Sequence, residues 1–146
     1  MTALDLPSQT GTSAARLRMA LVRLARTLRR HGDPGLSPSQ ISALATVEEF
    51  GPMRISTLAT YESMGAPAAT RVVASLEELN LFERRDDPND KRASVVDLSD
   101  VGRAALAKLW NERTIGLSSR LERLSAKERA AIDAALPALE KLVRDN

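Results

Sequence analysis

Apolar residues recur at spacings of three and four along most of the chain, which is the pattern of amphipathic helices. The first such run begins at Ser13 and ends near residues 31–35, where glycine and proline cannot continue a helix. Its apolar positions are Leu17, Leu21, Leu24 and Leu28. Two more helical runs close the chain, and Ser99 and Ser125 stand at their starts as N-caps. The pattern therefore predicts a mainly helical protein.

A serine followed by a proline begins a shorter helix in the middle of the chain. Ser37 can serve as N-cap, Pro38 suits the first helical position, and Gln40 completes a capping box. The apolar pattern carries this helix to Phe50, and the Gly-Pro pair at residues 51–52 ends it.

Two further short helices follow closely. Ser56 is expected to cap residues 57–62, and Gly65 stands before a helix that begins at residues 66–67. The buried face of this last helix is predicted from Ala69, Val72, Val73, Leu76 and Leu79. Asn80 lies where such a helix ends in a left-handed residue, a conformation that asparagine tolerates better than most residues.

Strand-like segments come next and predict a two-stranded hairpin. Residues 81–86 begin to show the alternation typical of a strand, and residues 93–98 are rich in β-branched side chains. The Asp-Pro-Asn-Asp sequence at residues 87–90 between them is a turn signal. Two short helices with a tight connection, followed by a hairpin, are the arrangement of a winged helix-turn-helix. The predicted fold class is therefore mainly α with a small β-hairpin, in the form of a winged helix-turn-helix.

The predicted elements divide the chain into four segments. Residues 1–12 are expected to form a flexible tail, residues 13–35 an N-terminal helix and loop, residues 36–98 the winged unit, and residues 99–146 the C-terminal helices. Pro137 lies inside the last helix and is expected to kink or split it.

Composition narrows the classes of protein to consider. A chain of 146 residues with 43% hydrophobic side chains can form one domain with a core. There is no cysteine, and His31 is the single histidine, so we expect no metal site and no cofactor. No run reaches the roughly 18 apolar residues of a membrane span, and the first residues do not resemble a secretory signal. We therefore expect a cytoplasmic protein without a membrane partner.

The same residues argue against an enzyme. No histidine lies beside a nucleophile, no glycine-rich phosphate loop is present, and Asp86, Asp87 and Asp90 lie on a hairpin tip that is too open to shift their pKa values by burial. We expect no catalytic residue.

Charge is distributed unevenly along the chain. The net charge is +2, yet residues 36–98 carry six basic against ten acidic side chains. A net acidic winged unit counts against DNA binding on bulk charge, and it keeps open the alternative of a winged-helix module that binds protein and not DNA.

The last of the middle helices has the dimensions and the surface of a DNA-reading helix. A helix about 10 Å wide fits the major groove, and small residues let its backbone approach the base edges. The outward residues are predicted to be Pro67, Ala68, Thr70, Arg71, Ala74 and Ser75. Arg71 can bond a guanine with two hydrogen bonds, and Thr70 can reach a base or a phosphate. An exposed arginine can equally be a solvated residue, so the helix alone leaves both interpretations open.

Four motifs follow one another through the middle of the chain: ISTLA at residues 55–59, ATRVVASLEELNLFERR at residues 69–85, DPNDKR at residues 87–92 and VDLSDVG at residues 96–102. Across roughly 45 residues this pattern resembles the MarR family of bacterial transcriptional regulators. The most specific of these motifs is the wing pattern of two arginines, an acidic proline turn and Asp-x-Arg.

The resemblance implies a homodimer that acts on double-stranded DNA. In such a protein the N- and C-terminal dimerisation helices of two subunits interleave, whereas periodicity alone allows them to form an intramolecular core. The resemblance further implies a repressor or activator on a pseudo-palindromic operator, in a bacterial cytoplasm, that often responds to a small and frequently aromatic ligand. No ligand-binding residue can be named; Phe50 and Trp110 are most simply core, and Tyr61 is either a phosphate contact or packing.

Three positions depart from the family pattern. Ser63 and Asn80 stand where glycine is usual, and Gly65 stands where a serine often caps the reading helix. Glycine is an acceptable N-cap, at a cost of a few tenths of a kcal/mol.

The hairpin tip can then be interpreted as a wing that contacts DNA. Asp90 is expected to hold Arg92 by a short-range ion pair, and Arg92 to enter the minor groove, where a narrow A·T tract concentrates negative potential. Arg84, Arg85 and Lys91 are assigned to phosphates.

Overall fold

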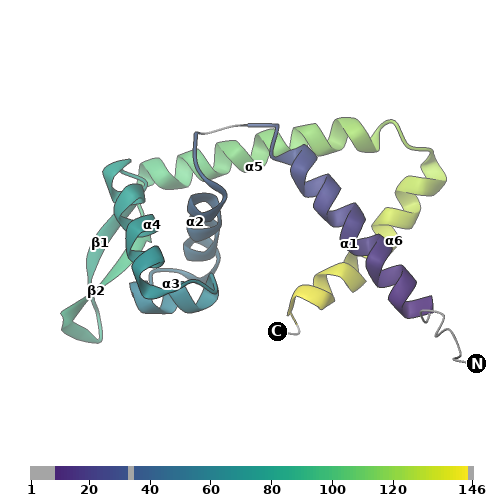
Figure 1. Cartoon of the computed structure of the whole chain (residues 1–146). Coiled ribbons are helices and arrows are strands. Elements are labelled where there is room, and N and C mark those ends of the chain that lie inside the picture. The colour runs from purple at the N-terminus through teal and green to yellow at the C-terminus, as the bar shows by residue number, and fades with distance from the viewer. Residues whose placement is uncertain (1–8, 33–34, 145–146) are drawn as a thin grey trace, which may run out of the picture. The chain divides into compact units, whose positions relative to one another are not determined.

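The computed structural model describes residues 9–32 and 35–144, and its elements form two compact units (Figure 1). We call residues 32–111 the winged unit, and residues 1–31 with 112–146 the terminal-helix unit. The long helix α5, Asp100–Leu121, contributes residues to both units.

The winged unit contains the helix-turn-helix and the hairpin in the predicted order. Its remaining elements are α2 (Pro38–Phe50), α3 (Ile55–Tyr61), α4 (Ala66–Glu78), β1 (Phe82–Asp87) and β2 (Asp90–Leu98). The predicted capping box begins α2, because the Ser37 hydroxyl accepts the Gln40 N–H at 3.2 Å and the Gln40 side chain accepts the Ser37 N–H at 2.7 Å. The expected fold class is confirmed.

A continuous apolar core joins these helices to the base of the hairpin. Its most deeply buried members are Leu44, Val47, Leu58, Val73, Leu76, Val96 and Leu98. Met53 extends the sheet by one residue, since its N–H and C=O both pair with Val96, at 3.1 and 2.8 Å. The core therefore fixes the strand bases and leaves the hairpin tip outside it.

Helix α3 begins two residues earlier than a Ser56 cap predicts. Its N-cap is Arg54, whose carbonyl accepts the N–H groups of Thr57 and Leu58, and no side chain caps it. The pairing of Met53 with the hairpin ends the extended segment immediately before this point. The expectation of a Ser56 cap is therefore wrong.

The end of α4 confirms one prediction and corrects another. Asn80 has φ 57°, the left-handed conformation expected there. The chain then reverses so that the Leu81 N–H reaches the Leu76 carbonyl at 2.8 Å. Leu81 is buried by this turn, whereas Leu79, which the apolar pattern assigns to the buried face, is 50% exposed.

The hairpin is longer than predicted. Its antiparallel strands pair from Phe82 opposite Leu98 to Asp87 opposite Asp90, so only Pro88 and Asn89 lie between them. The register shifts between Asp86 and Asp87, which makes the ladder irregular just below the tip.

The junction between β2 and α5 is closely packed. Ser99 caps α5 by accepting the Gly102 N–H at 2.9 Å, as predicted. A Cβ atom at Gly102 would lie 2.1 Å from the carbonyl oxygen of Leu81, so no larger residue fits without moving the backbone.

The terminal-helix unit contains α1 (Gln9–Leu28), the second part of α5 and α6 (Ala126–Arg144). Helix α1 begins four residues before the predicted start at Ser13, so residues 9–12 are helical and not part of a flexible tail; residues 1–8 lie outside the described residues. Ser125 and Glu128 form a capping box, as expected. Pro137 lies within α6 and does not split it.

His31 lies in the turn after α1 and packs on α5. A Cβ atom at Gly116 would lie 2.7 Å from Cδ2 of the His31 ring, and Nδ1 of that ring is 3.2 Å from the Thr27 carbonyl oxygen.

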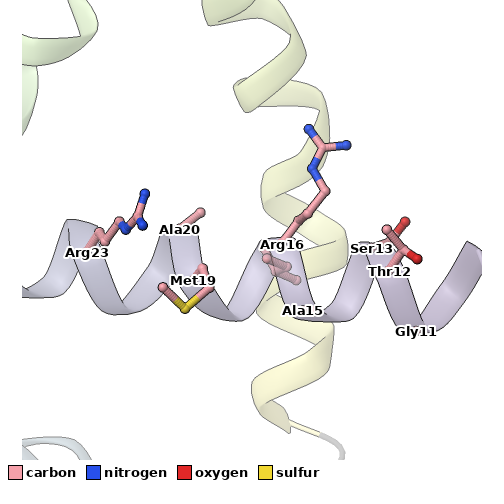
Figure 2. Close-up of a pocket in the computed structure, with 9 residues that line it drawn as sticks. Gly11, Thr12, Ser13, Ala15, Arg16, Met19, Ala20 and Arg23 are labelled. Atoms are coloured by element: carbon pink, nitrogen blue, oxygen red, sulfur yellow. The ribbon is translucent and has the colours of Figure 1, made fainter. Parts of the chain in front are cut away.

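The terminal-helix unit exposes its apolar side chains. Every buried hydrophobic residue of the described chain lies between Ile41 and Leu109, in the winged unit. The exposed apolar residues of the terminal-helix unit include Leu17, Met19, Leu21, Val22, Leu24, Ile115, Ile132 and Leu136. A hollow of about 860 Å³ runs along α1, and Figure 2 shows Arg16 and Arg23 extending from the same side of this helix. None of the described helices has the length and apolar character needed to cross a lipid bilayer.

Candidate nucleic-acid interface

Helix α4 presents one face to the core and another to solvent. Ala69, Val73 and Leu76 are fully buried, which fixes the helix against α2 and α3. On the other side Pro67, Thr70 and Arg71 are exposed, and Ala68 is half-buried. Gly65 is the N-cap, as predicted. The first two turns of α4 therefore offer small and hydrogen-bonding groups to a partner.

The two hydroxyl groups predicted for this face differ. Thr70 is exposed, and its hydroxyl donates to the Ala66 carbonyl at 2.9 Å, which leaves the oxygen able to accept. Ser75 is half-buried; its hydroxyl donates to the Val72 carbonyl at 2.7 Å and accepts from the Gln40 amide at 2.9 Å. Ser75 therefore lies toward α2, apart from the exposed face to which helical spacing assigns it.

The hairpin tip carries exposed cationic groups. Lys91 and Arg92 are exposed, and the Arg92 side chain retains 94% of its accessible surface. Asp90 Oδ1 accepts the Arg92 N–H at 3.0 Å and lies 3.6 Å from Arg92 Nε, so the expected short-range ion pair is present. The high exposure of the Arg92 side chain makes this pair weak.

The other arginines of the hairpin are held by carboxylates. Arg84 Nε lies 2.5 Å from Glu77 Oε1, and Arg85 Nη1 lies 3.1 Å from Asp97 while its Nε contacts Glu83 at 2.8 Å. The hydrogen bond to Glu77 raises the pKa of Arg84, and that to Glu83 raises the pKa of Arg85. These guanidinium groups are therefore less free to meet phosphates than Lys91 and Arg92.

Asp97 is a buried carboxylate that sequence reasoning missed. Its side chain is 2% exposed and bonds Arg85 and Arg103, at 3.1 and 3.0 Å, as well as the Leu98 N–H. Arg103 also reaches Glu48 of α2 at 3.0 Å. The acidic residue in an otherwise apolar run at 95–98 is the one sequence signal for this network.

Arg54 forms a second contact that sequence reasoning missed. Its Nε and Nη2 atoms lie 2.7 and 2.6 Å from Oδ2 of Asp87, at the end of β1. A bond from the Asn89 N–H and the contact with Arg54 lower the pKa of Asp87. No local pattern links these residues, which are 33 positions apart.

These pairs weaken the objection from bulk charge. Six of the ten acidic residues at positions 36–98 form ion pairs with Arg54, Arg84, Arg85 or Arg103. Among the described residues, Arg71 and Lys91 have no such ion pair. The exposed α4 face and the hairpin tip therefore each offer a cationic side chain that is not held by a carboxylate, Arg71 and Lys91.

Two aromatic side chains expected in other roles form a surface pair. Phe50 and Tyr61 stack with their ring centroids 4.6 Å apart, and they are 54% and 52% exposed. Phe50 is thus not a core residue, and the ring of Tyr61 is used in packing. Trp110, also expected in the core, is 40% exposed.

A helix-turn-helix followed by a two-stranded wing is the arrangement of a DNA-binding winged-helix protein (Figure 1). Lys91 and Arg92 are exposed at the tip of this wing. Comparison with known proteins narrows this class: the MarR family model matches residues 36–94. An HTH-type transcriptional regulator of Mycobacterium bovis is 34% identical over 134 residues, covering 91% of this chain and 94% of that protein. The chain belongs to the MarR family of transcriptional regulators, which are not enzymes.

Solved structures share this fold. A transcriptional regulator from Pseudomonas aeruginosa is 30% identical with a TM-score of 0.83, covering 95% of this chain and 99% of that one. PcaV of Streptomyces coelicolor, a transcriptional regulator solved in complex with its natural ligand, is 23% identical with a TM-score of 0.54, covering 97% and 98% of the two chains.

Proposed function

We propose that the protein is a sequence-specific transcriptional repressor that reads DNA with α4 and the wing. The observation that carries this proposal is the division of the basic residues. Arg71 lies on the exposed side of α4 and Lys91 and Arg92 lie at the hairpin tip, while six of the ten acidic residues at positions 36–98 form ion pairs within the unit. In this arrangement α4 enters the major groove and the tip reaches the adjacent minor groove.

The working form in this proposal is a homodimer built by the terminal helices. The support is that no apolar side chain of the terminal-helix unit is buried among the described residues, although α1 and α6 carry leucines at helical spacing. Exposed apolar surface of this extent marks an interaction site. The hollow along α1 is lined by residues of that helix alone (Figure 2), and in this proposal a segment of the second copy fills it. Dimerisation would place two reading helices about 34 Å apart, the spacing of half-sites in a pseudo-palindromic operator.

A gel-shift titration tests DNA binding. The protein is mixed with the DNA immediately upstream of its own gene and with a shuffled fragment of equal length. We expect a saturable shift of the first fragment, with log affinity falling linearly as log salt rises. A winged-helix module that binds protein would shift neither fragment, and that outcome would overturn the proposal.

Release by a small ligand is part of the same proposal. Its support is the fold shared with PcaV, which was solved with its natural ligand. Small aromatic compounds can be screened for a rise in melting temperature and then added to the gel shift. A compound that stabilises the protein and lowers its affinity for DNA supports release, because a ligand shifts an equilibrium only by its different affinities for the two states.

A further inference from the structure

Arg54 connects the start of the helix-turn-helix to the base of the wing. It is the N-cap residue of α3, but its side chain makes no capping bond and extends to Asp87 at the end of β1. The Arg54 side chain is 46% exposed, whereas that of Asp87 is only 8% exposed. The contact therefore joins two elements of the winged unit through a largely buried carboxylate.

Asp87 uses its two oxygen atoms for different purposes. Oδ1 accepts the Asn89 N–H at 2.9 Å, which closes the turn, and Oδ2 receives the Arg54 guanidinium. The turn that carries the tip is thus tied to α3 through one side chain. The register shift between Asp86 and Asp87 makes this tie more important, because regular strand pairing does not continue into the tip.

Asp90 extends the connection to the tip. Arg54 Nη2 lies 3.8 Å from Asp90 Oδ2, and the other oxygen of Asp90 accepts the Arg92 N–H. Arg54 therefore faces both acidic residues that hold the turn, and the second of these contacts the residue that we expect to enter the minor groove.

We propose that Arg54 is a positioning residue for DNA recognition, which holds the wing in the orientation that brings Arg92 to the minor groove. The inference rests on the proposed function, since it concerns how the wing meets DNA. A tip that is ordered before binding loses less conformational freedom when it docks. If one or two side chains are ordered in this way, the DNA affinity is about tenfold higher than that of a disordered tip.

The first test measures the wing without DNA. The chain contains no cysteine, so replacing Asn89 with cysteine gives a single site for a spin label at the tip. We expect Arg54→Gln and Asp87→Asn each to increase the mobility of the label, and Arg54→Lys to increase it less. Arg123→Gln, an exposed residue of the turn before α6, serves as the control, and circular dichroism confirms that each variant is folded. Unchanged mobility in folded Arg54→Gln would overturn the inference.

The second test is a double-mutant cycle on DNA affinity. If Arg54 acts through Asp87, the double variant Arg54→Gln/Asp87→Asn binds DNA about as weakly as either single variant, and all three lose minor-groove protection in a hydroxyl-radical footprint. If Arg54 contacts a phosphate directly, Arg54→Gln lowers the salt dependence of binding while Asp87→Asn binds normally, and the inference is wrong. Failure of the wild-type protein to bind DNA would instead reject the proposed function, and the mobility measurement would still decide whether Arg54 holds the wing.

Discussion

Arg71 projects from the exposed face of α4 and has no ion pair within the part of the chain that the structure describes. We predict that Arg71→Ala relaxes the preference for one base in each half-site by about 1–3 kcal/mol, because a two-bond contact to guanine is lost. Competition binding against operators changed one base pair at a time measures this preference. Equal weakening for all sequences would show that Arg71 contacts a phosphate.

Arg92 is the corresponding test for the wing. We predict that Arg92→Ala weakens operator binding on the order of tenfold or more and leaves the oligomeric state unchanged, because the side chain is almost fully exposed and contacts only Asp90 within the described chain. Fluorescence anisotropy measures the affinity and light scattering the mass. Arg123→Ala removes a similar charge from the other unit and is the matched control. Wild-type affinity in Arg92→Ala would reject the wing assignment.

The ionisation of Asp87 makes the free energy of unfolding depend on pH. Its pKa in the folded protein is lowered, first by the Asn89 N–H and then by Arg54. The contribution of the ionised Asp87 side chain to the free energy of unfolding is therefore complete above the ordinary carboxyl pKa of about 3.9. It is lost as the pH falls through the lowered pKa of the folded protein. We predict that the difference in free energy of unfolding between wild type and Asp87→Asn is constant from pH 7 to about pH 5 and shrinks at lower pH. Urea titrations followed by the fluorescence of Trp110 measure it, and a difference that stays constant in acid would contradict the prediction.

At the scale of elements, the first turn of α5 packs Gly102 against the backbone of Leu81, and a side chain at position 102 would prevent this contact. We predict that Gly102→Ala destabilises the winged unit by about 1–3 kcal/mol or more, because the added methyl group meets the Leu81 backbone and no rotamer change can relieve the overlap. Gly65→Ala is the control and should cost less, because a Cβ atom there would lie 3.8 Å from Cδ of Pro67, an ordinary van der Waals contact. Thermal unfolding of both variants decides; equal melting temperatures would show that the backbone shifts easily.

The elements also show how far the sequence predicts the structure. The capping box at Ser37, the left-handed Asn80 and the turn at Pro88 were predictable, because each depends on residues within a few positions of one another. Leu79 was misplaced because the turn at the end of α4 changes which leucine is buried. Helical periodicity alone does not predict where that turn lies.

The candidate site was less predictable than the fold. Periodicity predicts the exposure of Pro67, Thr70 and Arg71 on α4 correctly. Ala68, Ala74 and Ser75, which were also expected to face outward, are half-buried, and in the case of Ser75 this is because Gln40 approaches from α2. The partners of Arg54, Arg85 and Arg103 depend on tertiary contacts, and the sequence shows only that opposite charges are present. Whether an arginine is free for DNA or held by a carboxylate is therefore decided by the folded structure.

At the scale of the whole molecule, the exposed leucines of α1 predict the assembly. Leu21 is 50% exposed and lies on the same side of α1 as Leu17 and Leu24. We predict that Leu21→Glu converts the proposed dimer to a monomer and lowers operator affinity, since the two half-sites are then bound separately. Sedimentation equilibrium measures the mass. Arg26→Glu places the same side chain on the opposite side of the helix and should leave the dimer intact; a dimeric Leu21→Glu protein would contradict the proposed interface.

The lack of buried apolar side chains in the described terminal-helix unit has a consequence for gene dosage. In the proposed dimer the second copy supplies the core of this unit, so that folding and association become one equilibrium. When copies are few, the amount of protein that can bind DNA then grows with the square of chain concentration. Small changes in synthesis would produce larger changes in promoter occupancy, and the abundance of the regulator would act as a threshold on the genes that it controls.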